Sequence, residues 1–286
     1  MTARLDYFLW ALKRALGNGV ADVCPACGGS HLRIVRRKYG VTALRECGGC
    51  RLRFRTPKDD PGSAEAFYVD EVYKQGFTTD LPSDLELEGI LAGHFVGTEL
   101  DFAHRIKAIS VAGLEQGSRI LDFGSSWGYG SWQLTQAGYQ VYSYEIGRAR
   151  ANYAREKLKC TTVSDLQNLE GSVDCFFSSH VIEHLPNPNL LFDAAEKTLR
   201  PGGLLACFCP NGAVERERKH PDEYHSNWGK VHPIMLTPDF MKGEAARRGF
   251  TQCAVFSNPA DCSDIKSWRD GQLEGNELLL LARWKT

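Results

Sequence analysis

Four of the ten cysteines form two closely spaced pairs near the N-terminus. Cys24 and Cys27 make the first pair, and Cys47 and Cys50 make the second. A C-x-x-C pair supplies two thiolates from one tight turn, and two pairs complete the tetrahedral ligand set that zinc prefers. The spacing predicts a structural zinc ribbon with no position left for a catalytic water. Redox dithiols, or pairs that arise by chance, are the alternative.

A second candidate site is the stretch RILDFGSSWGYG at residues 119–130. Its apolar run ends in Asp122, and glycines follow at 124, 128 and 130. A dinucleotide-binding turn reads G-x-G-x-x-G and holds a pyrophosphate, but the glycines here have a different spacing. A carboxylate at this place would repel a pyrophosphate, and it suits a ligand that carries an ammonium or sulfonium charge.

The next predicted strand also ends in an acid, Glu145. A carboxylate at that position can accept both hydroxyls of a ribose. A ligand that combines a ribose with a cationic amino-acid tail is S-adenosylmethionine. Asp122 and Glu145 together therefore predict an S-adenosylmethionine site.

With these motifs, residues 100–286 resemble the class I S-adenosylmethionine-dependent methyltransferases. LDFGSSWGYG is similar to their glycine-rich first motif, with Gly124 and Gly128 in place and Ser126 where a glycine is usual. YSYEIG is similar to the second motif, which implies that Glu145 binds the ribose hydroxyls. The resemblance also implies a Rossmann-like α/β fold with the seven-stranded sheet of these enzymes.

Three further segments carry the resemblance. SDL at 164–166 is similar to the segment whose acid faces the adenine amino group, which implies cofactor contacts for Asp165 and Leu166. VDCFFSSHVIEHLPNP is similar to the fourth motif of the small-molecule branch, which implies that His180 lies beside the cofactor. LRPGGLLACFCPN resembles the entry to the fifth strand. A zinc ribbon ahead of such a domain resembles a subgroup with sugar C-methyltransferases, and the core motifs resemble small-molecule O-methyltransferases.

Methyl transfer to a hydroxyl or carbon acceptor also requires removal of a proton, for which histidine is suited. The stretch KHPDEYHSNWGKVHP at 219–233 is dense in histidines, and we predict His225 or His232 as the general base. His180 is a further candidate. An acceptor that needs no base, or a base within 67–115, stays open. A divalent metal held by Glu183 and a histidine also stays open, with an incomplete ligand set.

The elements that must position these residues follow from strand and helix periodicity. From residue 118 onward strand-like and helix-like segments alternate, which predicts a doubly wound, mostly parallel sheet. Ligands in such sheets bind beyond the carboxyl ends of the strands. The chain is predicted to comprise an amphipathic N-terminal helix, a zinc ribbon, a helical linker or cap and the methyltransferase domain, at residues 1–20, 21–60, 61–115 and 116–286.

The N-terminal segment has apolar residues at helical spacing, at positions 5, 8, 9, 12 and 16. This spacing predicts a helix that packs on the protein through that face. A peripheral membrane contact is the alternative. In the ribbon, Arg51, Arg53 and Arg55 alternate with apolar residues, which places them on one face of a strand. We expect a solvated face, and the alternative is a surface for an anionic partner.

The overall composition argues against several classes of protein. Thirty-four basic and 35 acidic residues give a net charge of −1, so no global charge attracts a polyanion. No apolar run reaches the ~20 residues that span a bilayer. The six other cysteines fall largely in strand-like runs, where they are expected as core residues of a cytoplasmic protein.

Three functions remain as hypotheses. The first is methyl transfer to a small molecule, such as a sugar, a sugar nucleotide or a secondary metabolite. The second is an RNA methyltransferase that docks through the basic ribbon, although SSHVIEH differs from the Asn-Pro-Pro-Tyr motif of many enzymes that methylate base amino groups. The third is a non-catalytic scaffold, against which the intact Asp122, Gly124, Gly128 and Glu145 argue.

Overall fold

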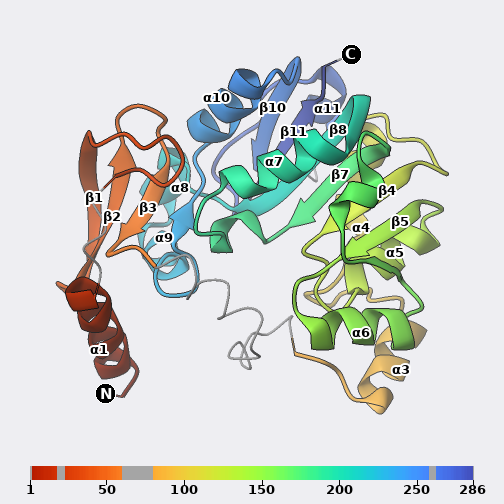
Figure 1. The fold of residues 1–286 in the computed structure, drawn as a ribbon, viewed down its shortest axis with the longest axis horizontal. Helices are drawn as coiled ribbons and strands as arrows, with labels where there is room; N and C mark the ends of the chain where they lie inside the picture. Colours follow the sequence, from red (N-terminus) through yellow and green to blue (C-terminus); the bar gives the residue numbers. More distant parts are fainter. Residues whose placement is uncertain (1, 18–22, 60–79, 258–261, 286) are drawn as a thin grey trace.

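The computed structural model describes residues 2–17, 23–59, 80–257 and 262–285. It contains a small four-stranded sheet and a seven-stranded sheet that is covered by helices (Figure 1). The small sheet lies beside helix α9 (Pro221–Asn227), which belongs to the larger unit (Figure 1). Helix α1 (Thr2–Gly17) extends from the small sheet (Figure 1).

The seven strands have the order β10-β11-β8-β7-β4-β5-β6. From β8 to β6 all neighbours are parallel, and β11 runs antiparallel to both of its neighbours. This topology confirms the α/β, Rossmann-like sheet of the seven-stranded methyltransferase type. In chain order the strands are β4 (Arg119–Phe123), β5 (Gln140–Tyr144), β6 (Thr161–Val163), β7 (Val173–Ser179), β8 (Leu199–Pro210), β10 (Gln252–Ser257) and β11 (Glu277–Arg283).

Helices and short 3-10 turns connect these strands. Helix α10 (Pro238–Arg248) begins as its sequence predicts, because the Thr237 hydroxyl accepts a hydrogen bond from Phe240 N at 3.1 Å. The other elements are α3 (Asp84–Ala92), α4 (Ala103–Val111), α5 (Tyr129–Gln136), α6 (Arg148–Lys157), η1 (Leu166–Leu169), η2 (Ile182–His184), α7 (Asn189–Thr198), α8 (Val214–Lys219), α9 (Pro221–Asn227) and α11 (Cys262–Ser267).

The small sheet has the order β1-β2-β3-β9. Strands β1 (Leu32–Lys38), β2 (Thr42–Cys47) and β3 (Arg53–Thr56) come from the ribbon, but β9 (Ile234–Met235) comes from the chain beyond α9. Phe54 pairs with Ile234 across the β3–β9 ladder. The larger unit therefore supplies the last strand of the ribbon sheet and fixes the two parts together.

Two hydrophobic cores lie on the two faces of the large sheet. One face packs against α7 and α10, and this core continues into the ribbon through Leu52 and Phe54. The other face packs against α4 and α5. Ala108 and Ile109 of α4 are fully buried in this second core, so α4 packs on the large sheet.

Helix α1 contacts the ribbon through a different face from the one expected. The Tyr7 hydroxyl lies 2.9 Å from the Thr42 hydroxyl, and the Arg55 guanidinium lies 4.5 Å from the centre of the Trp10 ring. Four of the five apolar positions instead remain exposed, namely Leu5, Phe8, Leu9 and Leu12. The ribbon presents the Thr42 hydroxyl and the Arg55 guanidinium to the helix. The face of α1 that carries Tyr7 and Trp10 binds these groups and therefore packs on the ribbon. The side chain at position 16 lies outside the described residues.

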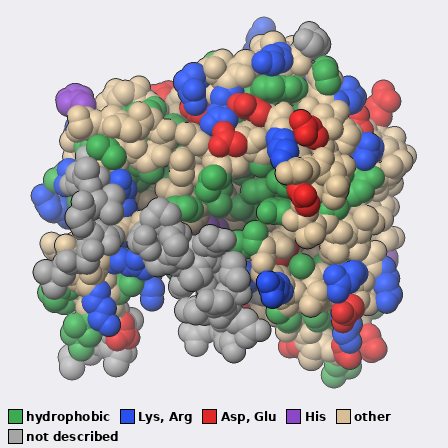
Figure 2. All heavy atoms as spheres, in the orientation of Figure 1, with side chains coloured by type: hydrophobic (Ala, Val, Ile, Leu, Met, Phe, Trp, Pro, Cys, Tyr) green, Lys and Arg blue, Asp and Glu red, His purple; other side chains and the backbone are tan. Residues whose placement is uncertain are grey.

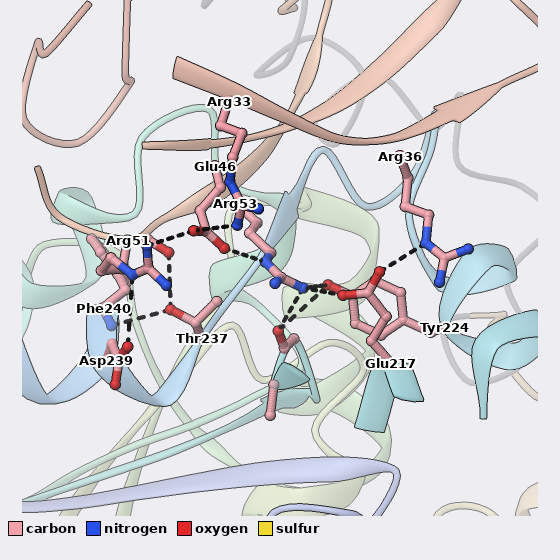
Figure 3. Close-up of polar contacts among 12 residues, drawn as sticks. Arg33, Arg36, Glu46, Arg51, Arg53, Glu217, Tyr224, Thr237, Asp239 and Phe240 are labelled. Carbon is pink, nitrogen blue, oxygen red and sulfur yellow. Dashed lines mark hydrogen bonds and ion pairs between the residues drawn. The ribbon is translucent and has the colours of Figure 1, made fainter. Parts of the chain in front are cut away.

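Two of the ribbon arginines, Arg53 and Arg55, are buried in ion pairs rather than on the expected solvated face, and Arg53 lies at the centre of an ionic junction (Figure 3). Arg53 is 2% exposed, and it donates to Glu46 at 2.8 Å, to Glu217 at 2.8 Å and to the Tyr224 hydroxyl at 2.7 Å. Arg55 is 1% exposed and pairs with Asp59.

The third arginine, Arg51, pairs with Glu46 and reaches Asp239 of α10 (Figure 3). Strand β9 and helices α8 and α9 cover this face of β3. The prediction of a solvated face was therefore wrong for Arg53 and Arg55, because the covering elements are distant in sequence, whereas the Arg51 side chain is 46% exposed.

None of the helices among the described residues is long and apolar enough to cross a bilayer.

Candidate functional site

The four cysteines of the two C-x-x-C pairs converge in the ribbon. The Cys24 and Cys50 sulfurs lie 3.5 Å apart, as do those of Cys27 and Cys47, and all four lie within 4.8 Å of one another. Four thiolates around a zinc ion at 2.3 Å would be separated by about 3.8 Å. The two sulfurs of a disulfide lie only about 2.05 Å apart, so the separations seen here are closer to those of a metal site. The cluster is consistent with a tetrahedral metal site.

The glycine-rich turn joins β4 to α5 and has the backbone that its sequence requires. Gly124 has φ 79° and Gly128 has φ 88°, both in the left-handed region that favours glycine. A Cβ on Gly128 would lie 2.7 Å from Ala154, and one on Gly124 would collide with Val181. Ser126 replaces the usual glycine yet still adopts φ 51°. The turn therefore keeps its tight course despite this substitution.

Asp122 lies beneath the turn rather than at its surface. Its carboxylate is 3% exposed and accepts a hydrogen bond from the Ser131 hydroxyl at 2.6 Å. Burial raises the pKa of Asp122 to about 7; the Ser131 hydrogen bond opposes this, and the Glu145 charge adds to it. The carboxylate thus supplies a negative charge that its surroundings compensate poorly.

Glu145 links the end of β5 to the glycine-rich turn. Its Oε2 accepts from Ser126 N at 3.0 Å, and its Oε1 accepts from Gly147 N at 2.7 Å. The hydroxyl oxygens of Ser125 and Ser126 are buried, and neither has a hydrogen-bond partner among the described residues. These two oxygens lie in a turn where a Cβ at Gly124 or Gly128 would clash. Both features are consistent with a site that binds a polar ligand.

Asp165 and Leu166 follow β6, the next strand in the sheet. Asp165 is exposed and caps η1 by accepting from Gln167 N at 2.8 Å, while Leu166 is partly buried against the larger core. Since β4, β5 and β6 are adjacent and parallel, Asp122, Glu145 and Asp165 lie at successive strand ends along one edge of the sheet.

His180 follows β7, and two carboxylates hold it. Its Nδ1 lies 3.1 Å from Glu183 Oε1 and its Nε2 lies 2.7 Å from Glu277 Oε1. Desolvation opposes protonation of the ring, but these hydrogen bonds outweigh it and raise the pKa of His180 to about 9. Arg105 of α4 also pairs with Glu277. Both ring nitrogens of His180 are therefore engaged within the protein.

His232 lies with Glu183 and His184, although a long stretch of sequence separates them. The rings of His184 and His232 are 4.7 Å apart between centroids, and both residues are close enough to Glu183 to share one ion. The Glu183 side chain is fully buried, and that of His184 is 17% exposed.

His225 is placed elsewhere. Its ring packs edge-on against Trp228 at 5.6 Å between centroids. Burial lowers the pKa of His225, and Lys38 and Arg36 of β1 lower it further. The structure therefore brings His232, but not His225, together with Glu183 and His184.

Three contacts in this region escaped the sequence reasoning: those of Ser131, Arg105 and Glu277. Ser131 lies within the predicted helix after the turn, where nothing marks it as a partner of Asp122. Glu277 opens the strand ELLLLAR, directly before four leucines, and this position was the available signal. Because β11 is antiparallel, its first residue lies at the edge where the parallel strands end.

Comparison with known sequences points to one family. Residues 121–207 match the family described as "Methyltransferase domain". The chain is 30% identical over 106 residues to the ubiquinone biosynthesis O-methyltransferase of Nitrobacter winogradskyi, covering 33% of this chain and 40% of that protein. It is 29% identical over 149 residues to the biotin biosynthesis bifunctional protein BioHC of Cellvibrio japonicus, covering 49% and 28%. The chain thus spans less than half the length of these relatives.

Similar solved structures share little sequence with this chain. A TehB-like S-adenosylmethionine-dependent methyltransferase from Corynebacterium glutamicum has a TM-score of 0.49 at 18% identity, covering 79% of this chain and 100% of that one. A possible histamine N-methyltransferase from Thermotoga maritima has a TM-score of 0.47 at 18% identity, covering 70% and 95%.

Proposed function

We propose that this chain, which carries a class I S-adenosylmethionine-dependent methyltransferase domain, transfers a methyl group to a hydroxyl or carbon of a small molecule. The observation that carries the proposal is the shared edge of β4, β5 and β6. There Asp122, Glu145 and Asp165 stand at successive strand ends around the glycine-rich turn.

S-adenosylmethionine supplies an electrophilic methyl group on a sulfonium. In our proposal the chain's own residues bind and orient that ligand. Glu145 exchanges its backbone hydrogen bonds for the ribose hydroxyls, and Asp165 with Leu166 holds the adenine. The buried charge of Asp122 favours the cationic amino-acid end through the field beneath the turn. The unpaired hydroxyls of Ser125 and Ser126 offer further contacts.

We assign proton removal from the acceptor to the cluster Glu183, His184 and His232. Of the three histidines considered as bases, His180 has both ring nitrogens hydrogen-bonded to carboxylates. His225 belongs to α9, packs against Trp228 and faces the charges of Lys38 and Arg36 of the ribbon. His232 follows α9 but lies beside η2, at the carboxyl end of β7. This geometry favours His232 among the predicted bases.

We propose a sugar, a sugar nucleotide or a related secondary metabolite as the acceptor. A polar hollow near His180 is lined in part by Asp101, His104, Arg105 and Glu277. Charged side chains of both signs suit a ligand with several hydroxyls, which donate to the carboxylates and accept from the cations. Exposed hydrophobic side chains also gather at the middle of one face of the molecule (Figure 2).

The RNA alternative has less support than the ribbon sequence implied. Arg53 and Arg55 are buried in ion pairs and do not face solvent. RNA docking would then depend on the remaining basic residues of the ribbon. Binding of RNA measured across a salt series tests it, since affinity that rests on several phosphate contacts falls steeply with salt.

We also propose that Cys24, Cys27, Cys47 and Cys50 hold a structural zinc ion. The ribbon core is continuous with that of the larger domain through Leu52 and Phe54. Zinc binding should therefore stabilise the junction between the two parts as well as the ribbon.

Calorimetric titration with S-adenosylhomocysteine tests the cofactor assignment. We expect micromolar binding by the wild-type chain and at least tenfold weaker binding by Glu145→Gln. Glu156→Gln is the matched control, because Glu156 is an exposed acid on the neighbouring helix α6. A folded wild-type chain that does not bind, or a Glu145→Gln variant with wild-type affinity, would contradict the assignment.

A further inference from the structure

We infer that Glu183, His184 and His232 bind a divalent transition-metal cation at the acceptor site. This inference deepens the proposed function and rests on it for the role of the cation. The three residues come from η2 and from the segment that connects α9 to β9. Their potential ligand atoms all lie within 4.8 Å of one another.

The first argument is the orientation of the two imidazoles. His184 Nδ1 lies 3.0 Å from the Val231 carbonyl oxygen, and His232 Nδ1 lies 2.7 Å from the Asn227 carbonyl oxygen. A carbonyl only accepts, so each Nδ1 carries the proton and donates it. Nε2 is then the atom through which each ring can bind a cation. A backbone hydrogen bond that fixes the tautomer in this way is the usual support of a metal-binding histidine.

The second argument is the state of the Glu183 carboxylate. Its Oε1 is near His180 Nδ1 at 3.1 Å and near His184 Nε2 at 3.9 Å. Its Oε2 is buried and has no hydrogen-bond partner among the residues that the structure describes. A buried carboxylate oxygen without a partner carries a large desolvation penalty, which a bound cation would offset.

The third argument is the composition and openness of the cluster. Two imidazoles and one carboxylate form a ligand set that suits zinc and other first-row divalent cations. Metal–ligand bonds of about 2.0–2.2 Å separate neighbouring ligand atoms by about 3–3.5 Å, so the cluster need contract only modestly. Three protein ligands leave at least one coordination position open. Since the His184 side chain is 17% exposed, that position can face solvent and acceptor.

The cation would act on the acceptor hydroxyl. Coordination lowers the pKa of a bound hydroxyl, as it does for bound water. In the step that we propose, the O–H bond of the coordinated hydroxyl breaks and its proton passes to solvent water. The electron pair stays on the oxygen, which is thereby the better nucleophile for methyl transfer. In this step the cation, with His184 and His232 as its ligands, takes the place of the direct base that the proposed function assigns to His232.

The test uses the full-length chain with zinc already bound at its four cysteines. Manganese is a suitable probe, because thiolates select zinc, whereas a site with a carboxylate ligand accepts Mn²⁺. Mn²⁺ is titrated and the free ion is followed by electron paramagnetic resonance. In parallel, zinc per chain is measured after dialysis against excess Zn²⁺. We expect one Mn²⁺ site in the wild-type chain, or two zinc ions per chain where manganese binds too weakly.

The variants Glu183→Gln and His232→Gln should weaken this binding at least tenfold. His225→Gln is the matched control, because it removes an imidazole from the same segment but outside the cluster. His184→Gln serves as the second histidine variant if His232→Gln is unfolded by circular dichroism.

Two results would overturn the inference: no Mn²⁺ site together with a single zinc per wild-type chain, or binding that persists unchanged in the folded variants. S-adenosylhomocysteine binding measured on the same samples separates the two proposals. If that ligand binds while no second cation does, the metal site fails and the proposed function stands. If the cation binds and the ligand does not, the proposed function fails and the metal site stands.

Discussion

Replacing Asp122 by asparagine should stabilise the free protein, and more so at high pH. Burial raises the pKa of Asp122 from 3.8 to about 7. The hydrogen bond from Ser131 lowers this pKa, and the negative charge of Glu145 raises it. Between these two values the folded chain binds a proton that the unfolded chain has lost. The stability of the wild-type protein therefore falls as the pH rises through this window.

The magnitude follows from the size of that shift. One pKa unit corresponds to about 1.4 kcal/mol, so the ionised Asp122 costs about 4 kcal/mol of folding free energy at pH 8. At pH 6 the cost is about 3 kcal/mol, because the folded carboxyl is then mostly protonated. Asparagine can still accept from Ser131, but its buried amide adds donors that cost about 1–3 kcal/mol. We expect a net gain of about 2 kcal/mol at pH 8 and about 1 kcal/mol at pH 6.

The assay is urea unfolding in the presence of excess zinc, with the variant and the wild-type chain compared at each pH. Asp174→Asn is the control, since it is another sheet carboxylate. Burial raises the pKa of Asp174, but hydrogen bonds from Arg119 N and the Arg200 side chain outweigh this and leave the pKa below its ordinary value. This variant should lose stability by a similar amount at pH 6 and pH 8.

An Asp122→Asn variant that is less stable at pH 8, or whose gain does not change with pH, would refute the reasoning. The wild-type chain keeps this unfavourable charge because, in our proposal, it attracts the cationic end of the cofactor. The same variant should therefore bind S-adenosylhomocysteine at least tenfold more weakly. Greater stability with weaker ligand binding is the pattern expected of a binding residue.

Three further predictions concern the cofactor site, the ionic junction and the ribbon. The affinity of the wild-type chain for S-adenosylhomocysteine should fall about tenfold from pH 8 to pH 6, because Asp122, with its pKa of about 7, becomes protonated. Calorimetry that finds equal affinity at both pH values would exclude Asp122 as the residue that attracts the cationic end of the cofactor. Arg53→Met should lower the unfolding free energy by about 1.5–3 kcal/mol, since it removes the buried cation that Glu46 and Glu217 share, although Arg51 stays paired with Glu46. Arg36→Met at the exposed rim should change it by less than about 1 kcal/mol in the same urea experiment. Cys24→Ser should lower zinc content by one ion per chain and Cys160→Ser should not, as elemental analysis of the dialysed proteins can show.

Local sequence was sufficient wherever one segment carries the whole signal. The strand over 119–123 and the helix over 238–248 follow from apolar runs, capping residues and glycine breaks. The glycine-rich turn identified the family because its backbone needs small residues at fixed positions, and Ser126 still adopts the left-handed conformation there. The two C-x-x-C pairs likewise marked their own turns.

Tertiary structure decided everything that depends on segments far apart in the chain. Strand period placed Arg53 on one face of β3, but only the arrival of β9 and α8 made that face a buried junction with Glu217. The apolar stripe of α1 gave no indication that the aromatic face would pack instead, because the partner surface belongs to the ribbon.

The histidines show the same division. The sequence by itself marks His180 and His232 as residues able to move protons, since that ability belongs to the imidazole itself. Which of them is available is set by their neighbours. Glu277 reaches His180 because β11 runs antiparallel, and His232 meets Glu183 and His184 because β9 pairs with the ribbon beside η2. Residue types and local spacing determine what chemistry the chain can perform, whereas the folding of distant segments onto one another determines where that chemistry takes place.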